Sequence, residues 1–280
     1  PDQGGPLLPD GILDLSGVVE FNIPQSLANG TLVAAAPDDQ YPIDTTDVDW
    51  NFDGEGQGLG KDWAVFRCNP NSNTGLLPHH AQGDFFRMTR ENPVITNTMR
   101  ITGCGIDDTP AGSTDNRNSD NRTLQTSTGP YINQSSSGAN FWHRYQVDTE
   151  PANSGSPIIW TNNGFTVGIH TNGGCQPDGT GANSGTSFEH NPLETALQSF
   201  PGNNTTYLDR VTAPGGVPED GTIFRPYNTL PEALSNVVSS GRILAVRGNY
   251  TNATGNTGLL GADGKAFLIT APVGTVTFGN

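Results

Sequence analysis

A serine flanked by small residues precedes an apolar segment in the middle of the chain, in the run Ala152-Asn153-Ser154-Gly155-Ser156-Pro157. A serine hydroxyl is a weak nucleophile unless a base takes its proton and backbone N–H groups stabilise the resulting oxyanion. Small residues permit the tight turn that exposes Oγ and directs amides inward. The run therefore predicts a nucleophile loop. An ordinary polar loop is the alternative, because serine and glycine are abundant throughout the chain.

Two strand-like runs follow this serine, at residues 156–160 and 165–170, and Thr161-Asn162-Asn163-Gly164 joins them. An Asn-Gly pair between β-rich runs is a strong hairpin signal. The hairpin would bring His170 back toward Ser154. Upstream, Asp62 stands at the start of the apolar run 63–66, where a carboxylate could orient and compensate an imidazolium.

These residues resemble the chymotrypsin-like serine peptidases, and above all the bacterial glutamyl endopeptidases. That branch has Gly-Asn-Ser-Gly-Ser-Pro at its nucleophile, then Gly-Ile-His, where this chain has Gly168-Ile169-His170. The resemblance covers roughly residues 17–200. It implies a double antiparallel β-barrel that hydrolyses peptide bonds through an acyl-enzyme at Ser154, with Asp62 as the orienting carboxylate and no cofactor.

The family's general-base histidine should precede Asp62, yet the first histidine of this chain is His79. Two explanations compete: a catalytically silent homologue, or a chain that begins just after that histidine. Pro1 is not an initiator methionine, and residues 15–22 resemble the strand that follows the family's histidine. We therefore favour the second explanation, and expect residues 1–280 alone to lack useful turnover.

The resemblance also implies an oxyanion hole built from the N–H groups of Ala152 and Ser154. Ala152 stands where the family usually has glycine. An L-residue pays roughly 1–2 kcal/mol for the left-handed backbone that glycine adopts freely, so we expect Ala152 to leave the loop partly flipped until substrate binds.

Three residues carry conflicting specificity signals. Thr149 and His170 match positions at which glutamyl endopeptidases hold the substrate carboxylate, and a protonated or hydrogen-bonding imidazole beside a hydroxyl would recognise an anionic side chain. Asp148 stands six residues before Ser154, where trypsin has the aspartate that binds lysine or arginine. If Asp148 and His170 paired, either preference would weaken. We expect an acidic side chain before the scissile bond as the first preference and a basic one as the second.

The remaining histidines show no metal-ligand spacing, so no metal site is predicted. His79 and His80 are expected in a solvated loop, and His143 and His190 in structural roles. Cys68, Cys104 and Cys175 form an odd set, and small buried thiols explain them as well as disulfides do. The glycine-rich run 54–60 follows several aspartates and opens no helix, which favours a flexible turn over a phosphate site.

The composition suits an exported β protein: 33% hydrophobic residues with 36 Gly and 21 Pro indicate many short strands and turns. A formal net charge of −15 disfavours nucleic acid and anionic membranes as partners. No apolar run reaches the roughly 18 residues that span a bilayer. We therefore expect a secreted protein whose partner is a protein or peptide substrate.

The predicted fold is all-β, a chymotrypsin-type double barrel with its N-terminal part truncated, over residues 1–203. Predicted strands include 17–23, 64–68 and 98–103, a polar loop covers 109–128, and a helix at 191–200 closes the domain. After the linker 201–204, residues 204–280 resemble the first coils of a pectin-lyase-like right-handed β-helix. A short helix ending at Val238 and strands at 242–246, 266–270 and 275–278 are predicted there.

Three functional hypotheses remain from the sequence. The first is a secreted serine endopeptidase with an appended β-helical module, which could contact a cell surface or polysaccharide. The second is an inactive homologue that serves as an extracellular binding module. The third is an accessory part of a polysaccharide-active protein, which would need a catalytic cluster that residues 204–280 do not show.

Overall fold

The computed structural model describes residues 17–52, 59–106, 118–176, 178–200, 202, 204–212, 214–251 and 264–279. The chain divides into two compact units: residues 1–78 with 92–193, and residues 79–91 with 194–280. This division differs from the predicted boundary after residue 203. Segment 79–91 and most of the helix predicted to close the first domain belong to the second unit.

The first unit begins with a three-stranded antiparallel sheet in the order β1-β2-β3. Its strands are β1 (Val18–Glu20), β2 (Gln40–Asn51) and β3 (Trp63–Cys68), and the 3₁₀ helix η1 (Pro37–Asp39) precedes β2. β1 is shorter than predicted, and Asn22 beyond it has a left-handed φ of 51°. The sheet does not close into a barrel over the described residues.

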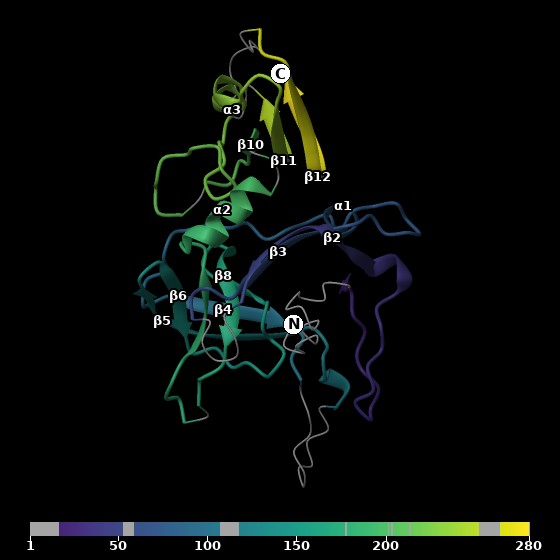
Figure 1. Ribbon diagram of the computed structural model, residues 1–280, viewed down its shortest axis with the longest axis vertical. Helices are drawn as coiled ribbons and strands as arrows, with labels where there is room; N and C mark the ends of the chain where they lie inside the picture. Colours follow the sequence, from purple (N-terminus) through teal and green to yellow (C-terminus); the bar gives the residue numbers. More distant parts are fainter. Residues whose placement is uncertain are drawn as a thin grey trace. The chain divides into compact units, whose positions relative to one another are not determined.

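The rest of the first unit contains a closed antiparallel barrel in the order β4-β5-β6-β9-β8-β7. Figure 1 labels four of its strands, β4, β5, β6 and β8. Its strands are β4 (Thr98–Gly103), β5 (Gln125–Ser137), β6 (Asn140–Tyr145), β7 (Pro157–Trp160), β8 (Phe165–Asn172) and β9 (Asn183–Ser187), and η2 (Asn118–Asp120) precedes β5. The buried core consists of Met99, Ile101, Tyr131, Tyr145, Val147, Ile158 and Val167. The predicted hairpin is confirmed, since β7 and β8 pair from Trp160↔Phe165 to Pro157↔Ile169.

The second unit contains a parallel sheet in the order β10-β11-β12, whose last two strands lie side by side in Figure 1. Its strands and helices are β10 (Thr205–Leu208), α3 (Leu230–Asn236), β11 (Gly241–Thr251) and β12 (Phe267–Gly279). Two further helices, α1 (Pro78–Gln82) and α2 (Asn191–Ser199), begin in the first unit and end in the second. Leu208, Leu230, Leu234, Ile243 and Tyr250 are buried in its core. The prediction of a mostly β protein is thus confirmed by the three sheets, while a β-helix remains a prediction.

Two strand predictions were wrong in extent. The separate strands expected at 266–270 and 275–278 form the single strand β12, because Val273 in the gap between them also pairs with β11, at Val246, with register shifts on both sides. The loop expected to reach Thr128 ends earlier, since β5 starts at Gln125 and pairs with β4. Residues 54–58, 109–117, 201 and 203 of the predicted loops and linker lie outside the described residues.

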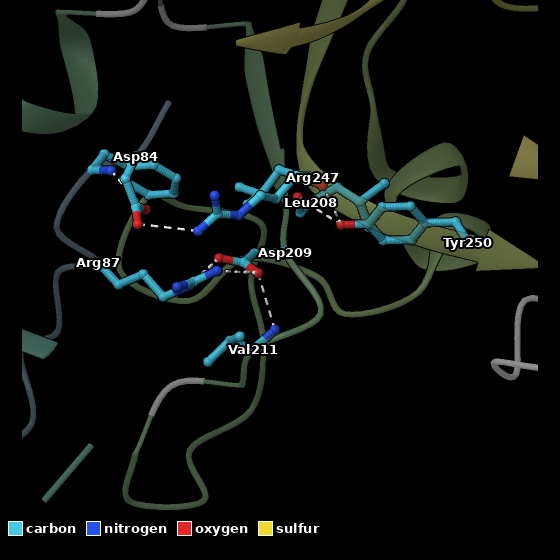
Figure 2. A network of polar contacts seen from close by, with 9 residues as sticks. Asp84, Arg87, Leu208, Asp209, Val211, Arg247 and Tyr250 are labelled. Atoms are coloured by element: carbon cyan, nitrogen blue, oxygen red, sulfur yellow. Dashed lines mark hydrogen bonds and ion pairs between the residues drawn. The ribbon is translucent and has the colours of Figure 1, made fainter. Parts of the chain in front are cut away.

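Segment 79–91 is tied to the second unit by ion pairs at every one of its four charged residues. The pairs are Asp84 with Arg247, Arg87 with Asp209, Arg90 with Glu194 and Glu91 with Arg225. Figure 2 shows the first two of these pairs beside Tyr250, whose buried hydroxyl donates to the carbonyls of Leu208 and Val246. Segment 79–91, which follows the first sheet along the chain, is therefore a structural part of the second unit.

Candidate active site

The loop that carries Ser154 is fastened to the end of β8. Ser154 Oγ donates a hydrogen bond to the carbonyl of Thr171, 3.3 Å away. The N–H of Gly155 donates to the carbonyl of His170, and the N–H of His170 donates to the carbonyl of Ser156, both at 2.8 Å. Ser154 is half-buried, so its hydroxyl is held at the barrel surface by backbone contacts.

Ala152 adopts the left-handed backbone expected of glycine, with φ at 70°. The loop thus has the backbone conformation expected where the family has glycine, and the partly flipped conformation expected for Ala152 is not seen. Asn153 supports the turn: its N–H donates to the carbonyl of Glu150 at 3.2 Å. The Asn153 side chain is buried against Gly103 and Gly105, where any Cβ would come within 2.5 and 2.6 Å of its amide.

Two N–H groups of this loop have no acceptor among the described residues, those of Ala152 and Ser154. The other N–H groups between residues 152 and 156 are all used, by the carbonyls of Glu150, Asn153 and His170. An oxyanion hole requires backbone donors that are not consumed by the protein itself. The two groups left available are those that the sequence assigned to this role.

Asp62 lies directly before β3, and its carbonyl accepts a hydrogen bond of 2.8 Å from Oγ1 of Thr186. Thr186 is fully buried on β9 and pairs with Ile169 of β8. Ser154 contacts the same stretch of β8 through the carbonyl of Thr171. The main chain at Asp62 is thus bonded to β9, whereas the loop that carries Ser154 is bonded to β8, and the role of the Asp62 carboxylate stays a prediction.

None of the five histidines occupies a position for the general base next to Ser154. His143 is buried between the hydroxyl of Tyr131 and the carbonyl of Val167, each 3.1 Å away, and burial lowers its pKa to about 4. His190 lies 3.0 Å from the carbonyl of Ala139. Both fit the predicted structural role. His79 and His80 lie on helix α1, which corrects their assignment to a loop.

The three predicted specificity residues take different positions. His170 is buried and its Nδ1 lies 2.5 Å from the hydroxyl of Tyr145. Burial lowers the pKa of His170 to about 4, so the imidazole is neutral at pH 7 and the protonated form that the sequence offered as one option is disfavoured. Asp148 is exposed and forms no ion pair with His170, both of them described residues, so the hypothetical pairing of the two is absent.

Thr149 is held by a residue that sequence reasoning missed, Asn183 of β9. The Asn183 amide donates to the carbonyl of Val147 and to Oγ1 of Thr149, both at 2.7 Å. Its Oδ1 accepts from the N–H of Cys175 at 2.8 Å. Asn183 stands in the polar run Asn183-Ser184-Gly185-Thr186-Ser187, which carries no apolar alternation and so gave no signal of a buried strand.

The described residues hold no group of three or more His, Cys, Asp or Glu arranged for a metal ion. Cys68, Cys104 and Cys175 are free thiols in this structure, and burial is the main cause that raises the pKa of the first two. Within the described ranges, no helix combines the length and apolar character needed to cross a bilayer.

Comparison with known proteins gives similarity to solved structures only. No protein-family model and no curated protein sequence matches the chain. A Glu endopeptidase structure with bound MPD has 20% sequence identity, with 67% of this chain and 74% of that chain covered, at a TM-score of 0.39. A thermostable serine protease from an extremophilic microorganism has 11% sequence identity, with 65% of this chain and 75% of that chain covered, at a TM-score of 0.43.

An HtrA-type protease, AlgW, solved with a decapeptide, has 14% identity, with 58% of this chain and 40% of that chain covered, and a TM-score of 0.35. These likenesses extend over part of each chain at low TM-scores. The assignment of roles to residues therefore rests on the local geometry around β8.

Proposed function

We propose that this protein is a secreted chymotrypsin-like serine endopeptidase, with Ser154 as the nucleophile and Asp62 as the orienting carboxylate. The observation that carries the proposal is the pair of unused N–H groups at Ala152 and Ser154, in the loop that carries the half-buried serine. Each oxyanion-hole donor typically contributes about 10²–10³ in rate. The acidic, Gly- and Pro-rich composition supports the extracellular location.

In the proposed reaction, Ser154 Oγ attacks the scissile carbonyl while a base takes its proton, and the carbonyl oxygen becomes an oxyanion bound by the two N–H groups. Collapse of this intermediate expels the amine and leaves an ester at Ser154, which water then hydrolyses. The preferred residue before the scissile bond is acidic, because Thr149 and His170 offer hydrogen bonds while Asp148 is exposed.

The proposed base is a histidine encoded before Pro1, because no histidine precedes Asp62 in residues 1–280. Reaction with a fluorophosphonate probe tests this, using residues 1–280, the product of a reading frame extended upstream, and Ser154→Ala in each. We expect label only on the extended wild-type protein. Label at Ser154 in residues 1–280 would show that the base assignment is wrong.

A silent binding homologue is the second candidate, favoured by one observation. Ser154 Oγ donates to a backbone carbonyl rather than to an imidazole. Without a base, binding and the oxyanion hole alone would leave only about 10³–10⁴-fold acceleration over water. An extended protein that stays unlabelled but still binds peptides would favour this candidate over the peptidase.

A polysaccharide-active role for the second unit has less support. Asp220 accepts hydrogen bonds from the N–H and hydroxyl of Thr222, and Arg225 is paired with Glu91. These two charged residues therefore serve the local structure, and they give no sign of a catalytic cluster. Contact of this unit with a cell surface or polysaccharide stays a prediction.

A further inference from the structure

Three residues of the barrel wall share one face of the sheet, and a fourth is hydrogen-bonded to them. Tyr145 of β6 pairs directly with Asn183 of β9, and Gly185, two residues further on β9, pairs with His170 of β8. Directly paired residues point to the same face of a sheet, as do residues two apart on one strand. Tyr145, Asn183 and His170 therefore form one group, and Thr149 joins it through the Asn183 amide.

The orientation of the Asn183 amide is fixed by backbone groups. Its Oδ1 faces the N–H of Cys175, which can only donate, and its Nδ2 faces the carbonyl of Val147, which can only accept. The second Nδ2 hydrogen must then go to Oγ1 of Thr149. Since Thr149 accepts this bond and has no other partner among the described residues, its own hydrogen is free to donate outward.

The tautomer of His170 follows from the same kind of accounting. Tyr145 is fully buried, and the sole partner of its hydroxyl among the described residues is Nδ1 of His170. A buried O–H group that failed to donate would leave an unsatisfied hydrogen, at a substantial cost in free energy. Tyr145 therefore donates to Nδ1, and the imidazole carries its proton on Nε2, which has no partner within the described ranges.

We infer that Tyr145 and Asn183 are positioning residues that turn His170 and Thr149 into two fixed hydrogen-bond donors for a carboxylate side chain of the substrate. This inference rests on the proposed function for the identity of the pocket. A carboxylate accepts hydrogen bonds only, and such charge-assisted bonds are about twice as strong as those to a neutral amide. The pocket selects glutamate or aspartate over glutamine and lysine without a charged imidazole.

Binding of product-like peptides tests the inference without any need for turnover. Acetylated tetrapeptides that differ only in a C-terminal glutamate, glutamine or lysine are titrated into residues 1–280 at pH 7. We expect the glutamate peptide to bind at least about tenfold more tightly than the glutamine peptide. Thr149→Val should remove most of this preference, and Thr149→Ser, which keeps the hydroxyl, should retain it.

The positioning role has a spectroscopic readout that a purely structural role would not move. In ¹⁵N NMR spectra of the imidazoles, with the His170 signals identified by their loss in His170→Gln, Nδ1 should be unprotonated and Nε2 protonated. Tyr145→Phe should shift His170 toward a mixture of tautomers and reduce the glutamate preference about tenfold. Tyr131→Phe is the matched control, because it removes the equivalent hydroxyl from His143, whose Nε2 is already bonded to Val167.

A protonated Nδ1 in wild-type His170 would overturn the inference, as would equal binding of the glutamate and glutamine peptides. A glutamate preference that survives both Tyr145→Phe and Thr149→Val would overturn it as well. Failure of the proposed function looks different. The extended protein would then stay unlabelled at Ser154 while its preference for the glutamate peptide and its sensitivity to Tyr145→Phe remained.

Discussion

Arg87 and Asp209, 122 residues apart in the sequence, form a two-point ion pair (Figure 2). Arg87 Nε lies 2.6 Å from Oδ2, and Nη2 lies 3.3 Å from Oδ1. The same Oδ1 accepts the N–H of Val211 at 3.0 Å, and only 6% of the Asp209 side chain is exposed. This pair fixes segment 79–91 to the loop that follows β10.

Asp209→Asn should destabilise the second unit, because it removes the countercharge of Arg87, whose side chain is 26% exposed. Since solvent reaches the guanidinium, we expect a loss smaller than the about 3–5 kcal/mol that follows removal of one partner from a fully buried ion pair. Asp84→Asn is the matched control: its pair with Arg247 is exposed at 62% and 48%, and exposed pairs contribute about 0–1 kcal/mol.

All four tryptophans, Trp50, Trp63, Trp142 and Trp160, belong to the first unit, so their fluorescence reports on that unit alone. We expect Asp209→Asn to lower the melting transition seen by far-UV circular dichroism and calorimetry while the tryptophan transition stays in place. Equal stability of the Asp209→Asn and Asp84→Asn variants would contradict a structural role for the Arg87–Asp209 pair.

The two buried histidines of the barrel should make the first unit sensitive to acid. Burial lowers the pKa of both His143 and His170 from 6.5 to about 4. Above pH 6.5 both imidazoles are neutral in the folded and in the unfolded chain, so they do not make the free energy of unfolding depend on pH. Between about pH 6.5 and 4 the unfolded chain binds protons that the folded chain excludes, so stability falls by up to about 1.4 kcal/mol per pH unit for each histidine.

Urea titrations followed by tryptophan fluorescence between pH 7 and 4.5 measure this slope. In His143→Gln the part of the slope that His143 contributes should disappear, whatever the variant's stability at pH 7. An identical slope in wild type and His143→Gln would show that the pKa of His143 is not lowered in the folded state.

Sequence patterns predicted those barrel strands that have apolar alternation or a turn signal. They missed a strand that has neither. Strand β4 (Thr98–Gly103) and the β7–β8 hairpin were identified from the chain. Strand β9 was missed, because Asn183-Ser184-Gly185-Thr186-Ser187 is wholly buried yet contains no large apolar residue. Its polar groups are buried because neighbouring strands satisfy them, and such pairing depends on tertiary contacts that a local pattern does not contain.

The candidate site divides in the same way. The loop around Ser154 and the position of His170 could be predicted from short motifs, whose spacing along the chain sets the geometry. Asn183 and Tyr145 could not, since their roles arise from cross-strand pairing between β6 and β9. The assignment of segment 79–91 to the second unit depends on ion pairs with residues more than 100 positions away, which no local pattern reports.

Gly185→Ala should destabilise the barrel because Gly185 lies at a close approach of β9 to β8. A Cβ at this position would come within 2.2 Å of the carbonyl oxygen of Ile169 and 2.6 Å of the side chain of Ile158. Forcing extra volume into a packed interior typically costs about 1–3 kcal/mol. Gly173→Ala is the control, since nothing lies within 4 Å of its Cβ and its φ is not in the left-handed region.

Urea unfolding followed by tryptophan fluorescence compares these two variants directly. We expect a lower midpoint for Gly185→Ala and no loss for Gly173→Ala. The His170 signals should also change in Gly185→Ala, because Gly185 is the direct partner of His170 in the β8–β9 ladder. A Gly185→Ala protein as stable as Gly173→Ala would indicate that β8 and β9 are not packed this closely.

Ala152→Gly should be neutral or stabilising, in contrast to most alanine-to-glycine changes. Ala152 has a φ of 70°, a conformation that costs an L-residue roughly 1–2 kcal/mol and costs glycine almost nothing. The greater freedom of glycine in the unfolded chain offsets roughly 0.5–1 kcal/mol of that gain. Ala64→Gly, in strand β3, relieves no left-handed backbone. It should therefore lower the free energy of unfolding by the cost of glycine's freedom in the unfolded chain. Urea titrations of both variants by tryptophan fluorescence would decide the matter: equal losses at positions 64 and 152 would mean that the loop before Ser154 does not hold Ala152 in the left-handed conformation in solution.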